Sequence, residues 1–243
     1  MRPLDQSDLA YVHATAFETI AAGAAGEIVR RLQSSTVDIH KIMDVGCGAG
    51  PLTRALVNAG FDVTSIDTSA ELLEMARANV PTAHLIHASA YDTPLDDYVA
   101  VGEPLTYHSD AREADSLVSG FFRRFADALS PGGIFIFDVI GLGKPSLAGG
   151  TWRSGDDWAV LVETAEDQNE RRLLRDIQVF RRVGGAYRRS QEVHQVRLFD
   201  ISVLRRELAA CGFAIEISAF YGAQALPPRR QAFFATRLAT KDS

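Results

Sequence analysis

The spacing of hydrophobic positions changes several times along the chain, and each change predicts an element. From residue 9 to residue 33 apolar side chains recur at helical spacing, which predicts one or two N-terminal helices. Short apolar runs then alternate with amphipathic stretches, which predicts a parallel sheet with helices on both faces. The predicted strands are 41–45, 61–66, 84–88, 98–102 and 134–139, and the predicted helices between them are 51–58, 70–79 and 110–129.

The pattern differs after residue 140. Residues 141–155 are rich in glycine and predict a loop. Three strand-like runs then follow one another without helices between them, which predicts an antiparallel insertion. A helix and two closely spaced strands, which predict a terminal hairpin, complete the pattern. These runs are 158–163, 173–183 and 187–198 for the insertion, 201–210 for the helix, and 213–221 with 231–238 for the hairpin.

Composition narrows the classes of function. The 243 residues are 47% hydrophobic and carry a formal net charge of −6, with two cysteines. An acidic balance disfavours nucleic acid as a partner. No apolar run reaches the length of a membrane span, and the first residues lack the apolar core of a secretory signal. The histidines and cysteines show no metal-ligand spacing, so we expect no metal site. The expectation is a cytoplasmic protein with reduced thiols.

The most informative segment links the first predicted strand to the next helix. It contains Gly46, Gly48 and Gly50, which let the backbone turn sharply and approach a ligand closely. Asp67 follows the next strand, where a carboxylate can accept hydrogen bonds from both hydroxyls of a ribose. A glycine turn in this context, together with an acid after the second strand, predicts a nucleoside-binding crevice.

The glycine spacing distinguishes between nucleoside cofactors. Dinucleotide-binding turns have the pattern G-x-G-x-x-G, whereas this turn is G-x-G-x-G, with Asp44 two residues before its first glycine. S-adenosylmethionine carries a sulfonium cation and an amino group and has no phosphate, so an acid beside the turn suits its charge. An alternative role for Asp44 is to organise the turn by hydrogen bonding.

Three segments together resemble the class I S-adenosylmethionine-dependent methyltransferases. Residues 44–50 (DVGCGAG) resemble the first motif of that family, residues 67–76 the second, and residues 129–135 (LSPGGIF) the turn before its fifth strand. The resemblance implies a Rossmann-like, mostly parallel seven-stranded sheet with a C-terminal antiparallel hairpin. It also implies one domain, with an N-terminal helical lid at 1–35, a cofactor-binding core at 36–140, the β insertion at 141–199 and the end of the core at 200–243.

The same resemblance assigns roles by position. The turn, with Asp44 nearby, is expected to hold the methionine part of the cofactor, and Asp67 the ribose. Thr68 and the segment after the third strand are expected to lie against the adenosine. Tyr11 belongs to the N-terminal segment, which often closes over the cofactor. The expected cofactor-binding residues are Asp44, Gly46, Cys47, Gly48, Gly50, Asp67, Thr68, Ser89, Ala90 and Tyr11, with Cys47 as a small turn residue and not a nucleophile.

The acceptor is expected beyond the fourth predicted strand. Glu103 and Tyr107 are the candidate catalytic residues there, with loop bracing as the alternative role. The loop lacks the Asn-Pro-Pro-Tyr type motif of methyltransferases that act on adenine or glutamine. On the insertion, strand alternation places Glu192 and His194 on one face, where they either line the acceptor pocket or are simply solvated.

The resulting expectation is methyl transfer from S-adenosylmethionine to a small molecule by in-line displacement. The chain also resembles a set of small bacterial methyltransferases with an Asp-Leu-Ala-Tyr start, here residues 8–11, for which no general substrate is implied. A methyltransferase acting on protein, and a non-catalytic cofactor-binding protein, are the alternatives. The oligomeric state is left as monomer or homodimer.

Overall fold

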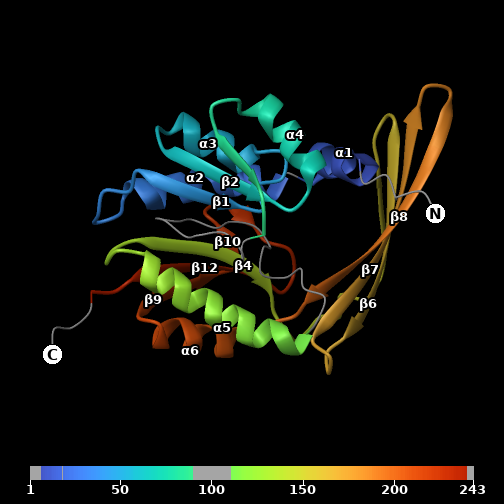
Figure 1. The fold of residues 1–243 in the computed structure, drawn as a ribbon. Helices are drawn as coiled ribbons and strands as arrows, with labels where there is room; N and C mark the ends of the chain where they lie inside the picture. The colour runs from blue at the N-terminus through green and yellow to red at the C-terminus, as the bar shows by residue number, and fades with distance from the viewer. Residues whose placement is uncertain (1–6, 18, 90–110, 240–243) are drawn as a thin grey trace.

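A computed structural model describes the fold of residues 7–17, 19–89 and 111–239 (Figure 1). The alternation predicted for the first half is confirmed within those residues. The helices are α1 (Ser7–Ala16), α2 (Thr19–Gln33), α3 (Pro51–Asn58), α4 (Ala70–Asn79), α5 (Ala111–Ala128) and α6 (Ile201–Ala210). The strands are β1 (Lys41–Val45), β2 (Asp62–Asp67), β3 (His84–His87), β4 (Ile134–Ile140), β5 (Gly149–Ser154), β6 (Trp158–Asp167), β7 (Arg172–Val183), β8 (Ala186–Arg197), β9 (Phe213–Ser218), β10 (Phe220–Tyr221), β11 (Gln224–Ala225) and β12 (Arg230–Arg237).

Two three-stranded sheets form the body of the molecule. β1, β2 and β3 are parallel, and β4, β12 and β9 are antiparallel in that order. The pairing of β9 with β12 confirms the predicted C-terminal hairpin. A continuous seven-stranded sheet is not established, because the described pairings give two separate sheets and the predicted strand 98–102 lies outside the described residues.

Alternate residues of β1 and β4 point into two different cores. Met43 and Phe137 pack with the buried face of α5 and α6, whereas Ile42 and Ile136 pack with α2 and α3. Period-two alternation therefore separates the apolar side chains of both strands into the same two layers. Helices cover both faces of the strands, as the pattern predicted (Figure 1).

Aromatic side chains dominate the core beneath α5. Phe135 stacks on Phe125 with ring centroids 4.1 Å apart, and Phe137 stacks on Phe233 at 4.8 Å. These stacked pairs join α5 to β4 and β4 to β12, and Phe121 packs edge-on against Phe125 within α5. Pairs of large offset rings contribute more than their buried apolar area alone, so this cluster stabilises the packing of α5 on β4 and β12.

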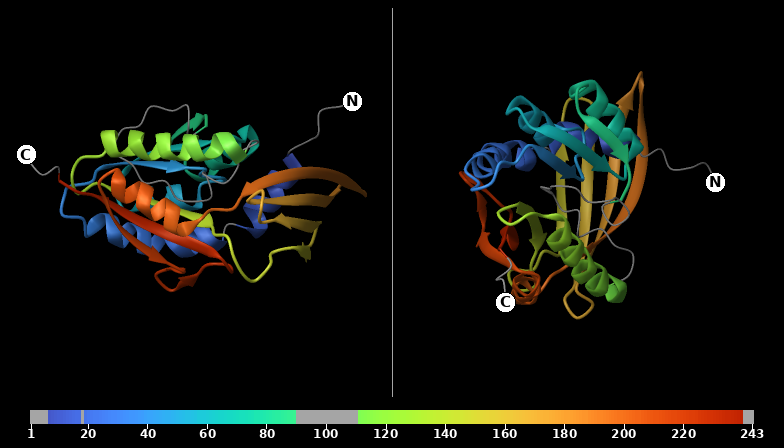
Figure 2. Two further views of the ribbon diagram at one scale, coloured as in Figure 1. Left: turned by 90° about the horizontal axis from the view of Figure 1, so that it is seen from below. Right: turned by 60° about the vertical axis from the view of Figure 1, so that its left-hand side comes forward.

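The insertion is a four-stranded antiparallel sheet, β5-β6-β7-β8. Three of its strands confirm the prediction, but β5 corrects it, because residues 149–154 were expected to be loop. β5 is exposed at every position and pairs with β6 from Gly149↔Thr164 to Ser154↔Ala159. Main-chain pairing rather than apolar alternation makes this strand, which explains why the pattern missed it. The sheet projects to one side of the body, beside α1 (Figure 2).

Candidate functional site

The glycine turn lies where β1 ends and α3 begins. Gly48 and Gly50 have φ angles of 57° and 88°, a region that side chains with a Cβ rarely adopt. A Cβ at Gly50 would press on Val80 at 3.2 Å, whereas a Cβ at Gly48 would meet no atom within 4 Å. Gly50 is therefore required by packing against α4 as well as by its backbone angle. At Gly48 the backbone borders open space that a ligand can fill.

Asp67 holds the turn from the end of β2. One of its oxygens, Oδ2, accepts a hydrogen bond from the Gly48 amide at 2.9 Å, and Oδ1 accepts one from the Ser69 amide at 2.8 Å. The residue is 9% exposed, at the edge of the cleft. A carboxylate has about four acceptor positions, so these two bonds leave capacity for ligand hydroxyl groups.

Asp44 is buried beneath the same turn. Its Oδ2 accepts a hydrogen bond from the Thr53 hydroxyl at 2.6 Å, and Thr53 lies 2.9 Å from the hydroxyl of Ser65. Its Oδ1 is buried without a hydrogen-bond partner in the described part of the chain. Burial raises the pKa of Asp44 to about 7, against the lowering effect of the Thr53 hydrogen bond, and the nearby charge of Asp67 adds to the rise.

A cleft of about 1140 Å³ opens from this turn toward the insertion. Most of the predicted cofactor-binding residues line it, namely Asp44, Gly46, Cys47, Gly48, Asp67, Thr68 and Ser89. Gly50 lies behind the lining, at the start of α3. Ala90, Glu103 and Tyr107 lie outside the described residues. The Cys47 thiol is buried, which raises its pKa and keeps it protonated.

Tyr11 faces the insertion, and the lining of the cleft does not include it. Its hydroxyl donates to Asp157 at 3.1 Å, and the Arg181 guanidinium lies 3.7 Å from its ring centroid. Desolvation and the Asp157 hydrogen bond raise the pKa of Tyr11, with the hydrogen bond as the larger cause. Neighbouring residues of α1, Leu9, Ala10 and His13, do line the cleft. Tyr11 therefore attaches α1 to the insertion, and its predicted contact with the cofactor remains untested.

The sequence did not point to a polar cluster on the opposite wall of the cleft. Asp138, near the end of β4, accepts a hydrogen bond from the Tyr221 hydroxyl at 3.2 Å and pairs with the Arg230 guanidinium. All three residues line the cleft. Asp138 carried a usable signal, because it is an acid near the end of an apolar strand, as Asp67 is. Tyr221 and Arg230 carried no such signal in the sequence, because only the fold brings them beside β4.

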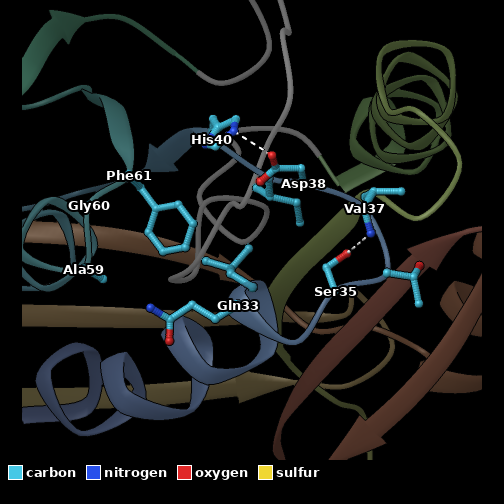
Figure 3. Close-up of a pocket in the computed structure, with 11 residues that line it drawn as sticks. Gln33, Ser35, Val37, Asp38, His40, Ala59, Gly60 and Phe61 are labelled. Carbon is cyan, nitrogen blue, oxygen red and sulfur yellow. Dashed lines mark hydrogen bonds and ion pairs between the residues drawn. The ribbon is translucent and has the colours of Figure 1, made fainter.

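A second hollow, of about 450 Å³, lies at the other end of β1 (Figure 3). Its labelled residues include Gln33, Ser35, Phe61 and a His40–Asp38 ion pair of 2.8 Å. Both members of that pair are more than three-quarters exposed, so water weakens their attraction. The glycine turn lies at the opposite end of β1, and we assign no chemistry to this hollow.

Metal-ligand clusters and membrane-spanning helices are both absent from the described residues. Among residues 7–17, 19–89 and 111–239, no group of three or more histidine, cysteine or acidic residues could hold a metal ion. No helix within the same ranges is long and apolar enough to cross a membrane.

Comparisons with known proteins agree with the fold and the turn. A family model described as a methyltransferase domain matches residues 43–137. YqeM of Bacillus subtilis (strain 168), whose name proposes a methyltransferase and gives no substrate, is 27% identical over 195 residues, covering 76% of this chain and 77% of that protein.

Solved structures show the same architecture. An S-adenosylmethionine-dependent methyltransferase from Clostridium acetobutylicum ATCC 824 superimposes with a TM-score of 0.76 at 18% identity, covering 95% of this chain and 98% of that one. CalS10 from Micromonospora echinaspora, an amino pentose methyltransferase solved with S-adenosylmethionine bound, gives 0.71 at 17% identity, covering 93% and 96%. At these identities the likeness concerns the fold.

These findings support the likeness of the chain to the class I S-adenosylmethionine-dependent methyltransferases, with no acceptor assigned. The family resemblance seen in the sequence is thus confirmed, and S-adenosylmethionine is confirmed as the cofactor of the family.

Proposed function

We propose that the protein transfers a methyl group from S-adenosylmethionine to a small-molecule acceptor by in-line displacement. The observation that carries this proposal is one continuous cleft, lined at one end by Asp44, Gly48 and Asp67 and at the other by the insertion. The likeness to CalS10, named as an amino pentose methyltransferase, supports a small acceptor at the end of the cleft that the insertion lines.

The residues at the turn fit the cofactor. Asp67 would accept hydrogen bonds from the ribose hydroxyls, and the Gly46 and Gly48 backbone would border the methionine part. The buried Oδ1 of Asp44, which has no partner among the described residues, would accept from the cofactor's amino group. Thr68, Ser89 and Ala90 would contact the adenosine. Bound S-adenosylmethionine supplies an activated methyl group, so the protein's part is to orient the acceptor and exclude water.

Several finer assignments belong to this proposal. The chain acts as one domain with the divisions given above, as a monomer or homodimer, without nucleic acid. We place it in the cytoplasm, which the two free cysteines support. Glu103 and Tyr107 serve the acceptor, and Tyr11 belongs to the lid.

The first experiment is calorimetric titration with S-adenosylmethionine, S-adenosylhomocysteine and NAD. We expect micromolar binding of the first two and none of NAD. Mass spectrometry of acceptor panels then detects products heavier by one methyl group. Binding without methylation of any small molecule would favour the protein-acceptor or non-catalytic alternatives, and binding of NAD alone would overturn the cofactor.

The affinity for S-adenosylmethionine should fall below neutral pH. Asp44 is protonated in the free protein below a pKa of about 7, whereas a cationic amino group beside it favours the carboxylate. Binding therefore releases a proton below that pH, and the dissociation constant should rise by up to about tenfold per pH unit. Calorimetry in two buffers of different ionisation enthalpy at pH 5.5 and 7.5 counts the protons. Asp44→Asn should remove the dependence, and equal affinity at both pH values would contradict the assignment.

Glu103→Gln should lower turnover more than cofactor affinity if Glu103 serves the acceptor. Steady-state kinetics and calorimetry on the same preparations separate the two effects. Glu74→Gln, at an exposed position of α4, is the matched control. Unchanged turnover would leave Glu103 as a structural loop residue.

A further inference from the structure

One face of the insertion sheet forms a wall of the cleft. Strand register places Val162, Ile177 and Glu192 in one row across β6, β7 and β8, and Thr164, Arg175 and His194 in the next. All six residues line the cleft. The first row is apolar except for Glu192 and the second row is polar, so this wall presents both kinds of side chain to the cleft. A polar molecule with an apolar part would suit such a surface.

Glu192 and His194 interact on this wall. The Nε2 atom of His194 lies 3.0 Å from Oε2 of Glu192, with the two side chains 30% and 17% exposed. The other carboxylate oxygen of Glu192, Oε1, is shielded from water and has no hydrogen-bond partner in the part of the chain that the structure describes. An unpaired carboxylate oxygen in a half-buried position is unfavourable, so it indicates a place where a ligand supplies the missing donor.

A purely solvated role does not explain this arrangement. Glu163 on β6 belongs to the opposite face of the same sheet and is exposed to water. Glu192 has lost most of its water and has gained one bond, to His194. The terminal torsion of a glutamate is broad, so a small rotation can bring the unpaired oxygen to a group in the cleft.

We propose that Glu192 binds the methyl acceptor through a hydrogen bond from an amino or hydroxyl group to its carboxylate. His194 is a positioning residue that donates to the other oxygen and so limits how far the carboxylate can rotate. The acceptor class is a small polar molecule that carries an N–H or O–H group. This inference rests on the proposed function, because it concerns the second substrate of the same cleft.

The test compares Glu192→Gln with Glu163→Gln, its matched control on the opposite face. The probes are small molecules in matched sets that differ only in carrying an amine, an alcohol or a methyl group at one position. For the amine or alcohol that the wild-type protein methylates, Glu192→Gln should raise KM by about tenfold, the weakening expected when a charged hydrogen bond becomes a neutral one. The S-adenosylmethionine Kd should stay within about twofold, and kcat should change less than KM.

His194→Ala should produce the same rise in KM with little change in kcat, because it releases the carboxylate. Equal KM values for Glu192→Gln and wild type would overturn the inference. The inference would also be overturned if the wild-type protein methylated probes that lack the amine or alcohol with the same KM as probes that carry it.

A second measurement needs no acceptor. Thermal unfolding of the ligand-free protein should show that Glu192→Gln does not lower Tm, because the amide oxygen can still accept from His194 while the carboxylate oxygen without a partner is removed. A fall of several degrees, absent in Glu163→Gln, would show a structural role and overturn the inference. Failure of the proposed function would look different. The wild-type protein would then bind no S-adenosylmethionine, or would bind it and methylate no probe. The Tm comparison would still decide the role of Glu192.

Discussion

Replacing Asp67 by alanine is expected to weaken S-adenosylmethionine binding by about 100-fold. Two effects combine. The variant would lose the hydrogen bonds that we propose for the ribose, and it would also release the Gly48 and Ser69 amides that Asp67 holds at 2.9 Å and 2.8 Å. A hydrogen bond to a charged group contributes about 1.5–3 kcal/mol, and loss of about 2.7 kcal/mol corresponds to 100-fold in affinity.

Calorimetry measures this loss, and Asp62→Ala provides the control. Asp62 begins the same strand at the far edge of the sheet and is exposed, so its removal changes charge without touching the turn. Asp67→Asn separates the two effects, because an amide oxygen can still accept from Gly48 while the negative charge is gone. Wild-type affinity in Asp67→Ala would refute the ribose assignment.

The contact between the glycine turn and Asp67 was predictable because its signals are local. The glycine turn follows β1 directly, and Asp67 ends β2. Parallel neighbouring strands bring their carboxyl ends to the same edge, so two short segments place Asp67 beside Gly48 without further knowledge of the fold. Asp138 is likewise an acid near the end of an apolar strand, but among the described residues β4 pairs with β12 and not with β1–β3, so this rule alone does not place it at the cleft.

The wall of the cleft that the insertion forms was less predictable because it depends on long-range packing. Alternation placed Glu192 and His194 on one face of β8, but it does not say which face of the sheet meets the cleft. That choice follows from α1, which packs on β7 and carries apolar side chains into the same cleft. Arg230 reaches Asp138 across 92 residues of sequence. β5 gave no pattern, since none of its residues is buried.

Asp8→Asn should loosen α1 from the insertion. Asp8 is fully buried, and its carboxylate accepts hydrogen bonds from Arg188 Nε at 2.6 Å and Nη2 at 2.5 Å. The Arg188 side chain is 41% exposed, so this pair contributes less than a fully buried pair would. We expect its loss to cost about 2 kcal/mol. Hydrogen exchange of the α1 amides should therefore accelerate by about 30-fold.

Asp156→Asn is the control, because Asp156 is an exposed acid of the same insertion. A double-mutant cycle with Arg188→Ala isolates the pair from other effects of each change. Since α1 supplies Leu9, Ala10 and His13 to the cleft, its release should also weaken S-adenosylmethionine binding, with global Tm less affected than local exchange. Faster exchange with unchanged cofactor affinity would mean that α1 only supports the insertion. If exchange protection of α1 and affinity for S-adenosylmethionine both fall, the buried carboxylate of Asp8 links the insertion to the wall of the cleft that α1 forms.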